Sequence, residues 1–184
     1  MRDFRPIDLL KATHERGSIV LVRGDLNVPI DDTGNLRDAT RLARLLPTLE
    51  TLTSGGMRVG ILSHFGRPKG ITDASLSLGP VAAALGQLVG AEIAFAEDCI
   101  GPAAASALTG LPEGGICVLE NTRFHAGEEA DDADFAAAMA APAHAYVNDA
   151  FSAAHRAHAS THGLAKLLPA FCGRAMKAEL AALD

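Results

Sequence analysis

The sequence predicts an α/β protein built on a doubly wound, Rossmann-like parallel sheet with helices on both faces, in three αβα layers. Three observations support this fold class. Five short apolar runs recur along the 184 residues, amphipathic segments lie between them, and the runs are continuous rather than alternating. Continuous apolar runs are typical of strands that are covered on both faces. Strands that alternate with helices are typical of a doubly wound sheet.

The five apolar runs are strand candidates because of their length and their content of β-branched residues. In chain order they cover residues 18–22, 58–62, 92–96, 115–119 and 143–147.

Two of the intervening segments have clear helical signals. Residues 38–52 are followed by two glycines that end a helix, and they place four leucines on one stripe: Leu42, Leu45, Leu46 and Leu49. Residues 78–89 begin just after a serine and have Pro80 in the first turn, where a missing N–H costs little.

Three further helices are expected toward the end of the chain. Asp98 is expected to cap a helix that runs toward Leu108, and an acidic start suits the dipole of a helix over residues 131–140. Residues 173–183 form a final amphipathic segment with no glycine or proline to end it. This ending is the one expected of a chain that has been cut from a longer protein.

Composition excludes several classes of protein. Hydrophobic residues make up 48% of the chain, which excludes wholesale disorder, and aromatic residues make up only 4%. Few aromatic rings and a net charge of −6 disfavour nucleic acid as a partner. No apolar run is long enough for a membrane span, and the charged N-terminal segment is not a secretory signal. The three cysteines, Cys99, Cys117 and Cys172, are expected to be reduced core thiols of a cytoplasmic protein.

Polar, glycine-marked clusters follow four of the predicted strands, at residues 23–29, 63–70, 120–129 and 148–158. In an open α/β sheet, ligands bind at the carboxyl ends of the strands, so these clusters are expected to form one site. The basic side chains that could converge there are His64 and four arginines: Arg41, Arg67, Arg123 and Arg156. Because guanidinium groups bind phosphate and carboxylate bidentately, the ligand is expected to be small and multiply anionic. Asp25 and Asn27 would orient a hydroxyl group.

Plainer interpretations stay open beside this one. Any single arginine can be a solvated or ion-paired surface residue, and Gly66 and Pro68 can serve only to shape a turn. The spacing of three histidines, His155, His158 and His162, resembles that of metal ligands and would suit a metal-dependent hydrolase. We expect packing histidines and no metal, since no cysteine lies near them in the sequence.

Four segments resemble, in order, the signatures of the phosphoglycerate kinase family: RGDLNVP, SHFGRPKG, LENTRFHAGEE and YVNDAFSAAHRAHAS. The resemblance implies a phosphotransferase of glycolysis. It would transfer the γ-phosphoryl group of MgATP to the carboxylate of 3-phosphoglycerate, giving 1,3-bisphosphoglycerate and MgADP, and would run in reverse. Members of the family are usually monomeric.

The resemblance also implies roles for individual residues. Arg41 matches the arginine that stabilises the transferring phosphoryl group and is the expected catalytic residue. The expected substrate-binding residues are Asp25, Asn27, Arg41, His64, Phe65, Gly66, Arg67, Arg123 and Arg156, of which the last two would hold the substrate's own phosphate. The chain departs from the family pattern at Gly24, Leu26, Phe65 and Ser152. Ser152 is expected to shift the loop that leads to Arg156.

The family's nucleotide-binding domain has no counterpart in this sequence. Residues 1–173 are expected to form the amino-terminal, substrate-binding domain, and residues 174–184 to begin the interdomain helix. Because MgATP and MgADP would bind to the missing domain, this chain is expected to bind no cofactor and to be inactive alone. A non-catalytic phosphoglycerate-binding or regulatory module is the alternative.

Overall fold

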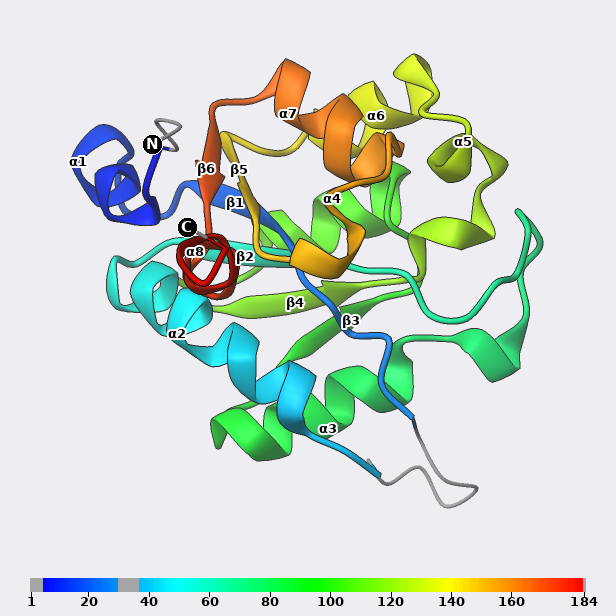
Figure 1. Cartoon of the computed structure of the whole chain (residues 1–184), viewed down its shortest axis with the longest axis horizontal. Helices are drawn as coiled ribbons and strands as arrows, with labels where there is room; N and C mark the ends of the chain where they lie inside the picture. Colours follow the sequence, from blue (N-terminus) through cyan, green and yellow to red (C-terminus); the bar gives the residue numbers. More distant parts are fainter. Residues whose placement is uncertain (1–4, 30–36, 184) are drawn as a thin grey trace.

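The computed structural model describes residues 5–29 and 37–183, which form one six-stranded parallel sheet (Figure 1). The order of the strands across the sheet is β3-β4-β2-β1-β5-β6. The strands are β1 (Ile19–Arg23), β2 (Arg58–Leu62), β3 (Ala94–Ala96), β4 (Ile116–Leu119), β5 (Ala145–Asn148) and β6 (Ala170–Cys172). All five predicted strands are therefore confirmed, each within two residues of its expected bounds.

The sixth strand is absent from the sequence-based prediction. β6 has only three residues and directly follows Pro169, so the sequence has no apolar run there that is long enough to predict a strand. It pairs in parallel with β5 at the edge of the sheet, with Tyr146 opposite Ala170 and Asn148 opposite Cys172. Long-range pairing with a neighbouring strand makes this segment a strand.

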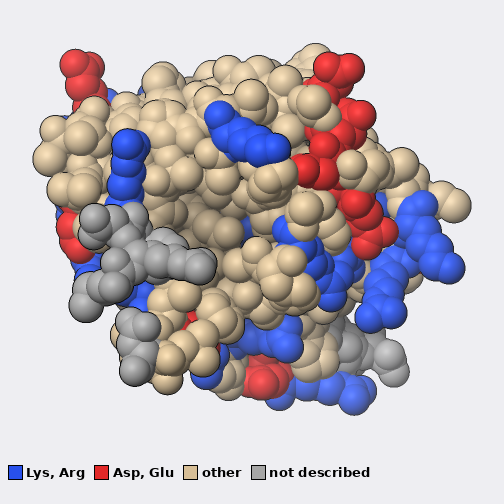
Figure 2. All heavy atoms as spheres, turned by 45° about the horizontal axis from the view of Figure 1, so that its top comes forward, with Lys and Arg blue, Asp and Glu red and all other residues tan. Residues whose placement is uncertain are grey.

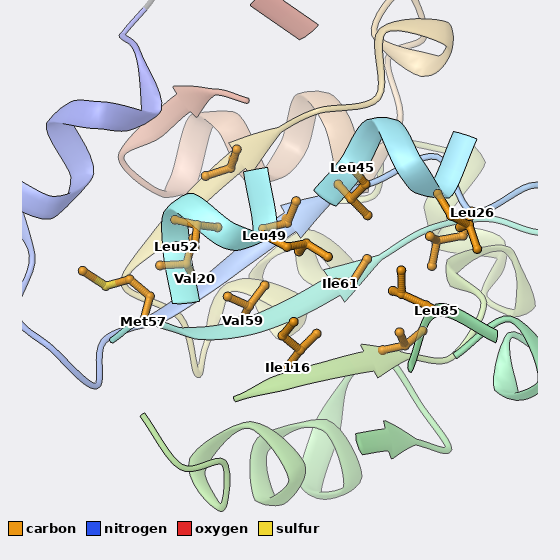
Figure 3. Close-up of a cluster of buried hydrophobic side chains, with 14 of the residues drawn as sticks. Val20, Leu26, Leu45, Leu49, Leu52, Met57, Val59, Ile61, Leu85 and Ile116 are labelled. Atoms are coloured by element: carbon orange, nitrogen blue, oxygen red, sulfur yellow. The ribbon is translucent and has the colours of Figure 1, made fainter. Parts of the chain in front are cut away.

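One face of the sheet is covered by α2 (Thr40–Ser54) and α3 (Gly79–Val89), with the short α1 (Leu10–Thr13) beside them. Leu45, Leu49 and Leu52 of α2 point at Val59 and the other strand residues of this face (Figure 3). Full burial of each such side chain contributes roughly 1.5–3 kcal/mol. The leucine stripe read from the sequence is therefore the face that packs α2 onto the sheet.

The opposite face is covered by α4 (Gly101–Thr109), α6 (Ala133–Ala140) and α7 (Leu164–Leu167), with α5 (Ala126–Glu129) beside α6. The side chains of β1 point alternately to the two faces of the sheet. Val20 and Val22 belong to the first core cluster, and Ile19 and Leu21 belong to the second. The doubly wound, three-layer α/β fold is confirmed.

The remaining elements are short or lie at the end of the described chain. Four are single 3-10 turns, at Ile7–Leu9, Ala74–Leu76, Thr122–Phe124 and Phe151–Ala153, and Ala159–Gly163 is a π-helix. α8 (Arg174–Ala181) packs against α2, and the backbone N–H of Arg174 donates to the Thr48 hydroxyl at 2.8 Å. In Figure 1, α8 is seen almost end-on between β6 and α2.

The predicted cap of the helix that runs toward Leu108 is wrong. α4 begins at Gly101 with Ile100 in the N-cap position, and Asp98 lies too far upstream to cap it. Its carboxylate instead accepts hydrogen bonds from the N–H groups of Cys99 at 2.7 Å and Ile100 at 3.3 Å. The side chain therefore orders the connection between β3 and α4.

The three cysteines are free thiols with buried side chains, as expected. Across residues 5–29 and 37–183, no helix has both the length and the apolar composition that crossing a lipid bilayer requires.

Candidate functional site

The four polar loops follow β1, β2, β4 and β5, and these are four adjacent strands of the sheet. Because every pairing among them is parallel, the four loops leave the sheet at the same edge. β3 and β6, which carry none of these loops, lie at the two outer positions. The strand order therefore brings together segments that are more than a hundred residues apart in the sequence.

Asp25, in the loop after β1, connects three parts of this edge. Its carboxylate pairs with Arg41 at the start of α2, with an Nη1–Oδ2 distance of 3.1 Å. It also accepts a hydrogen bond of 2.7 Å from the hydroxyl of Ser152, after β5. This contact depends on the serine hydroxyl, since a glycine at this position could not make it.

Asn27 connects the loops after β1 and β2. Its side-chain oxygen accepts from the N–H of Gly66 at 3.1 Å, and its backbone oxygen accepts from Arg41 at 3.3 Å. Gly66 has a φ of 62°, and a Cβ built on it would lie 2.7 Å from a methyl group of Leu76. The positive φ therefore favours glycine here, and a larger residue would also require the Leu76 side chain to shift.

Asn121, in the loop after β4, holds the backbone of Phe65. Its Oδ1 accepts from the Phe65 N–H at 3.2 Å, and its Nδ2 donates to the Phe65 oxygen at 2.7 Å. The Phe65 ring packs against the first core cluster. The backbone of this residue, and not its ring, therefore belongs to the edge where the loops meet.

Arg123 is a buried cation at this edge. Only 3% of its surface is exposed, its Nη1 donates to the Gly66 oxygen at 2.9 Å, and its Nε lies 3.2 Å from the Glu129 carboxylate. Burial lowers the pKa of Arg123, while the Glu129 charge raises it and the Arg156 charge lowers it further. Arg156 is itself exposed.

His64 lies between several of these charges. Burial, followed by the charges of Arg23 and Arg123, lowers the pKa of His64 from 6.5 to about 3. The imidazole is therefore neutral at physiological pH, and the positive charge of the site comes from its arginines.

Two hollows open at the end of β5. One is lined by Asp25, Arg41 and Ser152, among other residues, and the second by Asn148, His155 and Arg156. Figure 2 shows Lys and Arg side chains gathered toward the lower right of one face of the molecule, below a group of acidic side chains. The local excess of positive charge stands out in a chain whose net charge is −6.

The predicted site residues are thus largely brought together. Hydrogen bonds and one ion pair join five of them in a chain: Asp25, Arg41, Asn27, Gly66 and Arg123. His64 contacts Arg23, which directly precedes the loop after β1. The charge of Arg156 lowers the pKa of both His64 and Arg123, but within the described residues no hydrogen bond or ion pair joins its side chain to theirs. Arg67 is exposed on the loop after β2, and within the described ranges no hydrogen bond or ion pair joins its side chain to the others.

The histidines with metal-like spacing do not gather around one point. Nδ1 of His162 lies 2.5 Å from the Asp131 carboxylate, and Nδ1 of His158 lies 3.9 Å from Glu128. In the part of the chain that the structure describes, the only three possible ligand groups within 4.8 Å of one another are Asp98, Cys99 and His125. The spacing of the histidines therefore reflects their places in the π-helix and the turn before it.

Sequence reasoning missed four buried polar residues behind the loops: Arg23, Asn121, Glu128 and Ser160. All four lie inside the motifs that marked the loops. Arg23 is the last residue of β1, and a charged side chain at that position of a buried strand is the signal that could have identified it. Asn121, Glu128 and Ser160 carry no such signal.

Comparison with known proteins agrees with this architecture. The sequence profile of the family described as phosphoglycerate kinase matches residues 10–184. The chain is similar to the phosphoglycerate kinases of Methylorubrum extorquens (strain PA1), at 54% identity, and Azorhizobium caulinodans, at 57%. Both alignments extend over 183 residues, which is 100% of this chain and 45% of each relative.

Solved structures give the same result. The crystal structure of phosphoglycerate kinase from Pyrococcus horikoshii OT3 has a TM-score of 0.85 and 30% identity, covering 98% of this chain and 45% of that one. The structure of the Coxiella burnetii enzyme has a TM-score of 0.81 and 34% identity, covering 91% and 42%. The chain thus spans less than half the length of the relatives it matches. It belongs to the phosphoglycerate kinase family.

Proposed function

We propose that this chain is the 3-phosphoglycerate-binding part of a phosphoglycerate kinase. The observation that carries the proposal is the arrangement of arginine-bearing loops on four adjacent strands, with Arg123 buried at their meeting point. A buried guanidinium binds an anion strongly, because little water competes for it and its hydrogen bonds are charge-assisted. In this proposal residues 1–173 are the substrate domain and residues 174–184 begin the helix that leads to the second domain.

Each site residue has a proposed role. Asp25 and Asn27 orient the hydroxyl of 3-phosphoglycerate, and Arg123 and Arg156 hold its phosphate. Arg41 is the proposed catalytic residue, which neutralises charge on the phosphoryl group in transfer. The loop over His64, Phe65, Gly66 and Arg67 supplies further substrate contacts.

These roles suit the chemistry of transfer to a carboxylate. A carboxylate is already ionised at neutral pH, so the reaction needs no general base. Catalysis then consists mostly of alignment and of neutralising the charge on the equatorial oxygens of the phosphoryl group. The Asp25–Arg41 pair would have to open, or to share Arg41, when the substrate's carboxylate arrives.

The rest of the reaction is assigned to sequence outside this chain. MgATP or MgADP would bind to the second domain of the longer protein, while this part binds 3-phosphoglycerate or 1,3-bisphosphoglycerate in the cytoplasm. We propose a monomer that binds neither nucleic acid nor membrane. Because phosphoryl transfer needs the two bound substrates to be enclosed together, the 184-residue chain alone would not turn over. Turnover by the purified chain would contradict this part of the proposal.

Calorimetric titration with 3-phosphoglycerate tests the binding role. Arg123→Ala is expected to weaken binding by about 2–3 kcal/mol, roughly 30- to 150-fold in Kd, because a buried charge-assisted pair is lost. Arg41→Ala should weaken it less, since its main effect is expected in the transition state. Arg16→Ala is the matched control, because Arg16 pairs with Glu113 in an exposed ion pair. The proposal fails if the wild-type chain does not bind, or if Arg16→Ala weakens binding as much as Arg123→Ala.

A further inference from the structure

Three buried side chains form a hydrogen-bonded relay behind His64, and none of them is among the assigned site residues. Ser160 donates through its hydroxyl to Oε1 of Glu128 at 2.5 Å and through its backbone N–H to Oε2 at 3.0 Å. The same hydroxyl accepts from Nε of Arg23 at 2.9 Å. Glu128 and Ser160 have no exposed surface, and Arg23 is 1% exposed.

The relay ends on one nitrogen of the His64 ring. Nη2 of Arg23 lies 2.7 Å from Nδ1 of His64. Arginine has five N–H donors and no acceptor, so Nδ1 must accept this hydrogen bond through its lone pair. In a neutral imidazole the proton then has to be on Nε2.

The second ring nitrogen is the one left for a ligand. His64 is only half-buried, although Arg23 on its Nδ1 side is completely enclosed. Within the described residues, no hydrogen bond engages Nε2. Nε2 is therefore the nitrogen that is free to meet a bound anion.

We propose that Glu128, Ser160 and Arg23 are positioning residues that hold His64 as a neutral imidazole protonated at Nε2, so that the ring offers one hydrogen-bond donor to the anionic ligand. The identity of that ligand as 3-phosphoglycerate rests on the proposed function.

The choice of tautomer decides the sign of the interaction. With the proton on Nε2, the ring donates to an anion, whereas with the proton on Nδ1 it would present a lone pair and repel the anion. The imidazolium form of His64 would also donate from Nε2, but the surrounding charges disfavour it. The charges of Arg23, Arg123 and Arg156 together disfavour the imidazolium form, and the charge of Asp25 favours it to a smaller extent.

The negative charge of Glu128 allows the Arg23 guanidinium to be buried. Enclosing a guanidinium without a compensating charge is costly, and burial lowers the pKa of Arg23. The Glu128 carboxylate opposes this effect, and Ser160 bridges the two charges. Tyr146 fixes the bridge by donating to the Ser160 backbone oxygen at 2.8 Å.

Nitrogen NMR of the wild-type chain tests the proposal without any substitution. The chemical shifts of the two ring nitrogens report which one carries the proton. We expect the single Nε2–H tautomer for His64, with no titration between about pH 5 and pH 8, where an ordinary histidine changes charge. An Nδ1–H tautomer, a mixture of the two, or a midpoint near the ordinary value would overturn the proposal.

Ser160→Ala tests the relay itself, with Thr48→Val as the control. Thr48 is an equally buried hydroxyl residue, and it accepts from the backbone N–H of Arg174 and takes no part in the relay. Ser160→Ala is expected to give a mixture of tautomers and to weaken 3-phosphoglycerate binding about tenfold, as the loss of one charge-assisted hydrogen bond implies. The control should change neither. An unchanged tautomer and Kd in the folded Ser160→Ala chain would overturn the role of the relay.

The two measurements separate this proposal from the proposed function. A wild-type chain with the Nε2–H tautomer that does not bind 3-phosphoglycerate would refute the function and support the relay. A chain that binds 3-phosphoglycerate but has the Nδ1–H tautomer would refute the relay alone. If Ser160→Ala fails to fold, the wild-type spectrum still decides the tautomer.

Discussion

The Asp149 carboxyl group connects the loop after β5 with the start of α8, where it is buried. Its Oδ1 accepts from the backbone N–H of Met176 at 3.0 Å. Oδ2 is buried and, in the ranges that the structure covers, has no hydrogen-bond partner. The residue is 5% exposed, and burial raises the pKa of Asp149 from 3.8 to about 6.

This raised pKa makes stability depend on pH in a defined direction. The folded state binds the proton more tightly than the unfolded state, so protonation stabilises the fold at pH values below about 4. That contribution is lost as the pH rises toward about 6, where the folded carboxyl group ionises. The pKa difference between 3.8 and about 6 corresponds to roughly 3 kcal/mol.

Asp149→Asn removes the ionisation while keeping an oxygen that can accept from Met176. We expect the free energy of unfolding of the variant, minus that of the wild type, to rise by roughly 3 kcal/mol between about pH 4 and pH 7. Urea unfolding at several pH values, followed by circular dichroism, measures this difference. Comparing the two chains at each pH cancels the titration of all groups that they share.

A difference that does not change with pH, or that falls as the pH rises, would refute this reasoning. Asp73→Asn is a control of opposite sign. The Asp73 carboxylate accepts from the N–H and hydroxyl of Ser75, and these hydrogen bonds lower the pKa of Asp73. Its contribution to stability is present above the unfolded pKa and lost as the pH falls, so this variant should lose stability relative to the wild type as the pH rises.

Two further substitutions test the packing. Leu49 is 2% exposed, so Leu49→Ala leaves a cavity between α2 and the sheet. We expect it to lower the free energy of unfolding, measured by urea titration, by about 2–5 kcal/mol. A loss below about 1 kcal/mol would contradict the packing. Gly173→Ala would place a Cβ 2.2 Å from Oδ1 of Asp149, so α8 should detach and its amides should exchange with solvent faster. Gly79→Ala is the steric control, because Gly79 has no positive φ and a Cβ on it would come no closer than 3.5 Å to its neighbours. Protection of α8 that is unchanged in Gly173→Ala would argue against this contact.

Much of the fold could be predicted because its elements carry local signals. The strands of the sheet interior are apolar runs of β-branched residues, and α2 carries its leucines at helical spacing. The strand β6 and the π-helix Ala159–Gly163 carry no such signal. Their conformations depend on neighbours that are distant in the sequence, such as β5 for β6 and Glu128 for Ser160.

The candidate site divides in the same way. The sequence by itself determined which side chains are available, since the arginines, His64 and the glycine-marked turns stand in recognisable segments behind predicted strands. Only the tertiary structure decided that β4, β2, β1 and β5 are neighbours, and that Arg23 is enclosed while Arg41 and Arg156 are exposed. Sheet order and burial depend on packing between segments such as Arg23 and Ser160, which are 137 residues apart. No local pattern encodes a contact over that separation, so the relay behind His64 became visible only in three dimensions.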